Sequence, residues 1–140
     1  MMFYYLRKYP FSLALIAVVI YLSFFKPPKV DEALLFPGFD KVVHFCMYAG
    51  VSGMLWLEFF LNYRRGIAPK AHGFIGALVC PILMSGLIEI GQANLTTYRG
   101  GDWFDLLANI CGVLAATVFA WFVIHPWIVG RKCGKTRIED

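Results

Sequence analysis

Charged residues are scarce in this chain: Lys, Arg, Asp and Glu make up 16% of its 140 residues, against 59% for hydrophobic residues. A soluble domain carries about a quarter charged residues, so this composition excludes one of ordinary kind. Four long stretches are nearly free of charge, namely 9–25, 42–63, 71–88 and 106–130. Each has the roughly 17–25 residues that a helix needs to cross a bilayer. We therefore expect an all-α membrane protein, a bundle of four transmembrane helices in a single domain.

Signals for cleavage and for cysteine pairing are also absent. The first apolar stretch follows Arg7 and Lys8, as a signal peptide would, but no small-x-small site ends it and three more apolar stretches follow. We expect it to remain as the first helix. The four cysteines form no CxxC pair, and three lie within apolar stretches. Cysteine packs there as a small apolar residue, which favours packing over a disulfide or a metal site.

Basic residues are divided unevenly between the two ends of the expected bundle. With helices at about 9–26, 41–63, 71–91 and 103–129, both termini lie on one side, and that side carries nine of the 13 Lys and Arg residues. The positive-inside rule then places both termini in the cytoplasm, together with the basic tail at 130–140. Topology and attraction to anionic lipid headgroups explain the tail, so no nucleic-acid partner is expected.

Polar residues gather at the outer ends of the last three expected helices. Residues three or four positions apart share a face of a helix. Ionisable residues within a membrane normally face the bundle interior or a wet cavity, so we expect such faces to converge on one solvated pocket open to the outside. Three polar stripes have this spacing: Asp40, His44 and Tyr48; Ser85, Glu89 and Gln92; and Asp102, Asp105, Asn109 and Gly112.

Each of these residues also has a structural explanation when taken alone. Asp102 is a suitable N-cap, and Asp105 suits the positive end of a helix dipole. Asn109 can hold helices together by hydrogen bonding. An ion pair of Arg99 with Glu89 or Asp105 is the structural alternative for these two carboxylates. The joint placement of all of them is what favours a shared pocket.

Three further polar or helix-breaking residues are interpreted as structural. His44, taken alone, is typical of a hydrogen-bonded interior histidine. Glu58, near the inner end of its helix, is expected to reach the headgroup region or to pair with Arg64 or Arg65. Pro81 lies in the middle of an apolar stretch, where it removes one backbone hydrogen bond and predicts a kink.

The motifs "DKVVHFCMYAG", "EIGQ" and "YRGGDWFDLLANICG" resemble those of the VanZ-like family of small bacterial membrane proteins, over roughly residues 39–116. The resemblance implies a teicoplanin-resistance-protein-like protein of the bacterial inner membrane. Glycopeptide resistance is a family association and is not predicted for this chain. Ala116 stands where a further glycine is often expected. The family's polar positions fall here on Asp40, Lys41, His44, Tyr48, Glu89, Gln92, Arg99, Asp105, Asn109 and Gly112.

Two functions are compatible with these residues. In the first, the protein acts on or binds an anionic envelope lipid or a lipid-linked glycan at the outer leaflet. Helix N-termini, Lys41 and Arg99 would then hold a phosphate, while imidazole and carboxyl groups supply acid–base chemistry. The candidate catalytic residues are His44, Glu89, Asp105 and Asp40. The candidate ligand-binding residues are Lys41, Tyr48, Gln92, Arg99, Asp102 and Asn109.

In the second function, the protein is a non-catalytic accessory or scaffold, in which the polar residues hold the helices together and the bundle docks an envelope enzyme or a second copy of itself. The sequence leaves open whether the protein is an enzyme. Carboxylates with an imidazole suit several divalent metals. However, no spacing matches a known metal-binding motif, so the sequence predicts no metal site and no particular cofactor.

Overall fold

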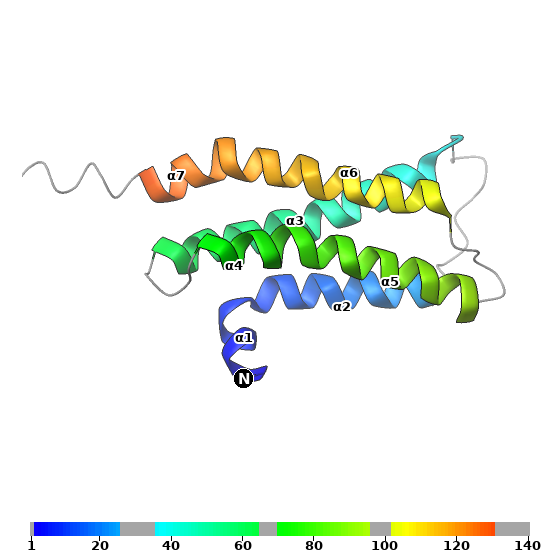
Figure 1. Cartoon of the computed structure of the whole chain (residues 1–140), viewed down its shortest axis with the longest axis horizontal. Helices are drawn as coiled ribbons and strands as arrows, with labels where there is room; N and C mark the ends of the chain where they lie inside the picture. Colours follow the sequence, from blue (N-terminus) through cyan, green and yellow to red (C-terminus); the bar gives the residue numbers. More distant parts are fainter. Residues whose placement is uncertain (1, 26–35, 65–69, 96–101, 131–140) are drawn as a thin grey trace, which may run out of the picture.

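A computed structural model describes residues 2–25, 36–64, 70–95 and 102–130 (Figure 1). Within these residues every regular element is helical, in agreement with the expected all-α class. Arg99 and the basic tail beyond Gly130 lie outside the described residues. The elements are α1 (Met2–Lys8), α2 (Pro10–Phe24), α3 (Phe39–Arg64), α4 (Lys70–Phe74), η2 (Ile75–Val79), α5 (Cys80–Leu95), α6 (Trp103–Phe119), η3 (Ala120–Ile124) and α7 (His125–Val129).

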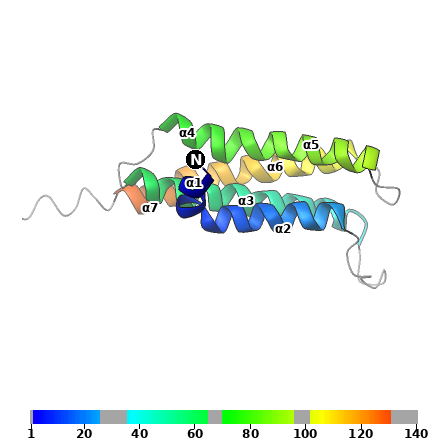
Figure 2. The same ribbon diagram turned by 90° about the horizontal axis from the view of Figure 1, so that it is seen from below.

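Three of the helices are long and apolar enough to cross a membrane. They cover Phe39–Arg64, Ala71–Leu95 and Trp103–Val129, and they lie lengthwise beside α2, while α1 turns away from the bundle at the start of α2 (Figures 1 and 2). α2 is apolar but has 15 residues. At about 1.5 Å per residue it is roughly 22 Å long, shorter than the ~30 Å hydrocarbon core of a bilayer. The chain is thus an all-helical membrane protein, and a fourth span stays a prediction.

Helices α3 and α6 form the closest pair in the bundle. A Cβ atom added at Gly112 would lie 2.3 Å from the carbonyl oxygen of Phe45 and 3.1 Å from the nitrogen of Ala49, both backbone atoms of α3. Only glycine fits at such a contact, which is the usual way for membrane helices to approach closely. Asn109, one turn before Gly112, is thereby brought against His44.

A π-helical turn precedes each of the two prolines within the long helices, η2 before Pro81 and η3 before Pro126. Proline has no N–H to donate to the carbonyl four residues earlier, which at Pro81 is that of Ala77. The hydroxyl of Ser52 on α3 donates to this carbonyl at 2.7 Å. The irregularity expected at Pro81 is therefore present as a π-helical turn, stabilised by a side chain from the neighbouring helix.

The short helix α2 is held at both ends by buried side chains of its neighbours. The carboxylate of Glu58 on α3 accepts hydrogen bonds from the backbone N–H groups of Phe11 and Ser12, each at 3.1 Å, and from the Ser12 hydroxyl. At the other end, Gln92 of α5 donates to the carbonyl of Ser23 at 2.6 Å. Glu58 therefore caps the first turn of α2. The sequence predicted Arg64 or Arg65 as its partner and gave no sign of this contact with α2.

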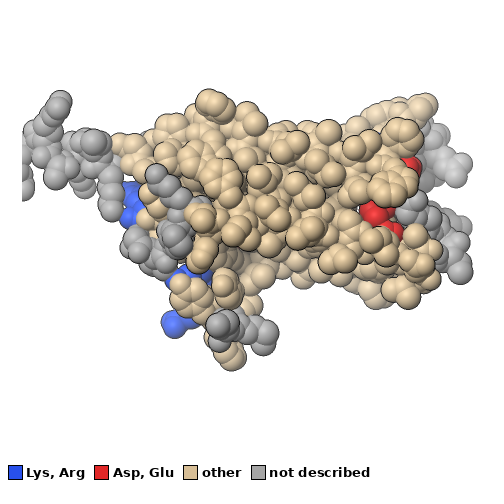
Figure 3. Space-filling model, viewed as in Figure 1, with Lys and Arg blue, Asp and Glu red and all other residues tan. Residues whose placement is uncertain are grey.

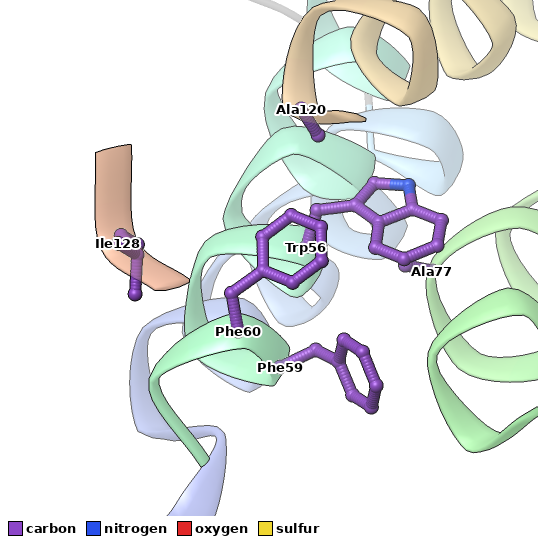
Figure 4. Close-up of a cluster of buried hydrophobic side chains, with 6 residues drawn as sticks. All are labelled: Trp56, Phe59, Phe60, Ala77, Ala120 and Ile128. Carbon is purple, nitrogen blue, oxygen red and sulfur yellow. The ribbon is translucent and has the colours of Figure 1, made fainter. Parts of the chain in front are cut away.

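An aromatic core fills the end of the bundle near α1 and α7. The buried Trp56 ring stacks on Phe60 with centroids 5.4 Å apart and meets Trp121 edge-on at 5.7 Å, and Ala120 and Ile128 pack around it (Figure 4). Lys and Arg lie at this end on the face shown in Figure 3, whereas Asp and Glu lie at the opposite end. The two ends of the bundle thus differ in both packing and charge.

Candidate functional site

Polar side chains from three helices meet at the end of the bundle opposite α1. α3 and α5 supply some of them, and the others come from α6 and the residue before it. Five are buried, and the remaining three, on α3 and at the start of α6, are more exposed. We call this group the polar cluster, and its members are Asp40, Lys41, His44, Ser85, Glu89, Asp102, Asp105 and Asn109.

Asp102 fixes the residue at which α6 begins, and therefore the depth within the bundle of the α6 residues that follow it. Its backbone is extended, with φ −119° and ψ 124°, and its side chain accepts a hydrogen bond from the N–H of Phe104 at 2.9 Å. This is an N-cap, as expected from the sequence. The Phe104 N–H, with a smaller contribution from Lys41, holds the pKa of Asp102 below its usual value. Asp102 is therefore an anion at any physiological pH.

A chain of hydrogen bonds crosses the buried part of the polar cluster. The amide nitrogen of Asn109 donates to the hydroxyl of Ser85 at 2.8 Å, and the amide oxygen lies 3.1 Å from Nδ1 of His44. Because that oxygen can only accept, Nδ1 is assigned the proton. The other ring nitrogen, Nε2, faces the rim of the cluster, 3.8 Å from Asp40 Oδ1 and 3.7 Å from Asp105 Oδ2.

Lys41 links two carboxylates at the rim. Its Nζ lies 3.2 Å from Asp102 Oδ2 and 3.2 Å from Asp105 Oδ1. The Lys41 side chain is 40% exposed, and such pairs contribute only about 0–1 kcal/mol to stability. The pairing matters more for function. Lys41 was predicted to bind an anionic ligand, but its charge is already paired with two aspartates.

Glu89 has one satisfied and one unsatisfied carboxylate oxygen. The residue is 7% exposed, and its Oε2 accepts from the backbone N–H of Asp102 at 3.2 Å. Oε1 has no hydrogen-bond partner among the described residues. Glu89 lines a groove between α5 and α6 with a volume of about 240 Å³. The rest of the groove wall is mostly apolar: Gly86, Ile90, Ala93, Asp102, Trp103 and Leu106.

Two predicted ligand-binding residues also pack against groups outside the polar cluster. Tyr48 is 1% exposed and packs with Val51 and Val113, while its hydroxyl lies on the side of Ser85 and Glu89. Gln92 is engaged with the end of α2, as described above. Arg99, a third predicted ligand-binding residue, lies outside the described residues, as do its expected ion pairs with Glu89 and Asp105. Ser85 shared a predicted stripe with Glu89 but was not assigned a role, and its hydroxyl now proves to accept from Asn109.

The polar cluster is acidic within the part of the chain that the structure describes. It contains four carboxylates, those of Asp40, Glu89, Asp102 and Asp105, and one lysine, which is paired. Such a cluster suits hydroxyl donors and cations better than a bare phosphate. Its two chemically distinct parts are Glu89, which lines the groove and has one oxygen without a donor among the described residues, and the group of Asp40, His44 and Asp105.

Comparisons with known proteins agree with the resemblance seen in the sequence. A family described as VanZ/LLP1 matches residues 1–125. No curated protein and no solved structure matches the chain.

Proposed function

Because the chain belongs to the VanZ/LLP1 family, we propose that it binds an envelope lipid, an anionic lipid or a lipid-linked glycan, in the groove between α5 and α6. The headgroup contacts the polar cluster and the apolar tail follows the groove toward the membrane. This proposal includes the expected topology: α2 completes a four-helix bundle in the bacterial inner membrane, both termini are cytoplasmic, and the polar cluster faces outward.

The observation that carries the proposal is Glu89, which lines an apolar groove and whose buried Oε1 has no hydrogen-bond donor among the described residues. A buried carboxylate oxygen without a donor is costly, by about 1–3 kcal/mol or more. A ligand hydroxyl supplies the missing donor. The small residues Gly86 and Ala93 leave space in the groove, and Ile90 and Leu106 provide apolar surface for a lipid chain. A headgroup with hydroxyls on an apolar tail meets both demands, and glycans and glycerolipids share this chemistry.

The charges of the cluster refine the expected headgroup. Lys41 is held by two aspartates, so it is a poor single clamp for a phosphate. An anionic headgroup therefore needs a further positive charge, for which Arg99 remains the predicted residue. The protein could also act on the bound lipid chemically. The predicted acid–base groups for such a reaction are Asp40, His44, Glu89 and Asp105, and an activity assay on the identified lipid tests them.

Filling the groove tests the proposal. Gly86 lines the groove and a Cβ atom added there meets nothing within 4 Å, so Gly86→Leu is expected to place its side chain in the groove. Gly50→Leu is the matched control, because Gly50 also has free space around it and lines a different, apolar hollow between α3 and α6. In native mass spectrometry of gently solubilised protein, we expect wild type and Gly50→Leu to carry a lipid that Gly86→Leu loses.

The mass of that lipid distinguishes a glycan-bearing headgroup from a phospholipid one. Equal lipid retention by all three proteins, or no specific lipid on wild type, would contradict the proposal. The scaffold function is then favoured, since the His44–Asn109–Ser85 chain joins three helices as a packing device also would.

A further inference from the structure

The orientation of His44 is fixed by the residues behind it. Asn109 donates to Ser85 with its nitrogen, so its oxygen accepts the proton on Nδ1 of His44. A neutral imidazole with its proton on Nδ1 presents a lone pair at Nε2. Histidines that bind metals are held in this way, with the other ring nitrogen donating to an oxygen of the second shell.

The lone pair at Nε2 faces two carboxylate oxygens. The distances to Asp40 Oδ1 and Asp105 Oδ2, 3.8 and 3.7 Å, are too long for hydrogen bonds. A cation placed between these three atoms is attracted by the lone pair and by both carboxylates. A proton on Nε2 would draw the oxygens to about 2.7–2.9 Å. A metal cation between the three atoms holds them farther apart.

The observed separations fit a metal. One ligand atom from each of Asp40, His44 and Asp105 lies within 4.8 Å of the other two. Around a tetrahedral zinc with bonds of about 2.1 Å, neighbouring ligand atoms are about 3.4 Å apart. Each oxygen must approach Nε2 by about 0.3–0.4 Å, and the two oxygens must approach each other by up to about 1.4 Å, which side-chain rotation, above all of the half-exposed Asp40, provides.

The surroundings also differ from those of a simple acidic patch. The side chains of His44 and Asp105 are 6% and 11% exposed. The other oxygen of Asp105 forms an ion pair with Lys41 at 3.2 Å, which helps to orient the carboxylate. Asp40, at 52%, lies on the open side, by which a cation enters and where further positions remain for water or a ligand oxygen.

From these contacts we propose that Asp40, His44 and Asp105 bind one divalent first-row transition-metal cation, such as Zn²⁺. One imidazole with two carboxylates suits these ions, whereas Mg²⁺ and Ca²⁺ prefer oxygen ligands throughout. The site stands on its own residues and needs no lipid. If the lipid proposed above carries a phosphate, the open coordination positions would accept one of its oxygens.

The test is calorimetric titration of Zn²⁺ into the purified full-length protein, prepared without a polyhistidine tag. Wild type is expected to bind one Zn²⁺ per chain. His44→Ala and Asp105→Asn should each lower the affinity by more than about 100-fold, and Asn109→Ala by about 10–100-fold, because it releases the ring from its orientation. Asp40→Asn, at a half-exposed position, repeats the ligand test with little risk to folding.

Asp102→Asn is the matched control. It removes the same charge from the same rim and keeps a side chain able to cap α6, so its Zn²⁺ affinity should stay within about threefold of wild type. No 1:1 binding to wild type overturns the proposal. So does equal loss in Asp102→Asn and Asp105→Asn, which indicates general charge, or unchanged binding in Asp40→Asn and His44→Ala, which indicates a site elsewhere on the surface.

Discussion

Replacing Gly112 by alanine should push α3 and α6 apart one turn from Asn109 and so disturb the polar cluster. The new methyl group would lie 2.3 Å from the carbonyl oxygen of Phe45, where about 3.3 Å is needed. The opposing atoms belong to the α3 backbone and cannot rotate away, so the helices must move apart by about 1 Å. Overpacking of this kind costs about 3 kcal/mol at the upper end of its usual range.

Part of this cost is offset, because alanine is the better helix former by about 1 kcal/mol. The expected net loss of unfolding free energy is therefore about 2 kcal/mol. Gly50→Ala is the control: its Cβ meets nothing within 4 Å, so it receives the gain of up to ~1 kcal/mol without the cost. The two variants should then differ by about 3 kcal/mol.

Equilibrium unfolding of the detergent-solubilised protein, followed by circular dichroism of its helices, measures both variants. Gly112→Ala should also weaken Zn²⁺ binding, since Asn109 and Phe45, next to His44, lie at the displaced contact. Stability of Gly112→Ala equal to that of Gly50→Ala would refute the close approach of α3 and α6.

Three further predictions concern polar groups that hold the bundle. Glu58→Ala leaves the first N–H groups of α2 unpaired and should lower the unfolding free energy by at least ~2 kcal/mol. Glu58→Gln keeps one acceptor oxygen but sets its NH2 group against the other N–H, so it should lose less than Glu58→Ala; equal losses would contradict the capping role. Ser52→Ala leaves the Ala77 carbonyl unpaired, at a cost of about 1–3 kcal/mol. A double-mutant cycle should show a smaller cost in a Pro81→Ala background, where residue 81 regains its own N–H, and an unchanged cost would contradict the account. Because the folded-state pKa of Asp102 is lowered from 3.8, its stabilisation is present above about pH 4 and is lost as the pH falls through the folded pKa. The stability difference between wild type and Asp102→Asn should therefore shrink on acidification, and a constant difference from pH 7 to pH 3 would argue against it.

Apolar runs and helical periodicity predict much of this fold, because both are local properties of the chain. The long helices follow from runs that match the thickness of a bilayer, and the family follows from an ordered set of polar motifs. The partner of Glu58 was not predictable in this way. It lies 46 residues earlier in the chain, and only the packing of α2 against α3 brings the two together.

The candidate site shows the same limit. A helical period of three or four residues indicates which face a side chain shares, but not what packs against that face or how deep each residue lies. Tyr48 is one turn deeper than His44 and therefore falls within the apolar core. Gln92 lies beside the C-terminal end of α2, and its side-chain N–H donates to the carbonyl oxygen of Ser23. The three proposed metal ligands, Asp40, His44 and Asp105, come from two helices, so no linear sequence motif predicts them.

The central claim, that the polar cluster is a ligand site and not a device for holding helices together, is tested most directly at Glu89. Glu89→Gln keeps an oxygen that can accept from the Asp102 N–H but replaces Oε1, which has no donor among the described residues, by an NH2 group that cannot accept a hydrogen bond from a ligand hydroxyl. The measurement is native mass spectrometry and thermal unfolding on the same preparation. Loss of the bound lipid with stability no lower than wild type is the predicted result. A retained lipid, or no lipid in either protein together with a fall in stability, would contradict the claim.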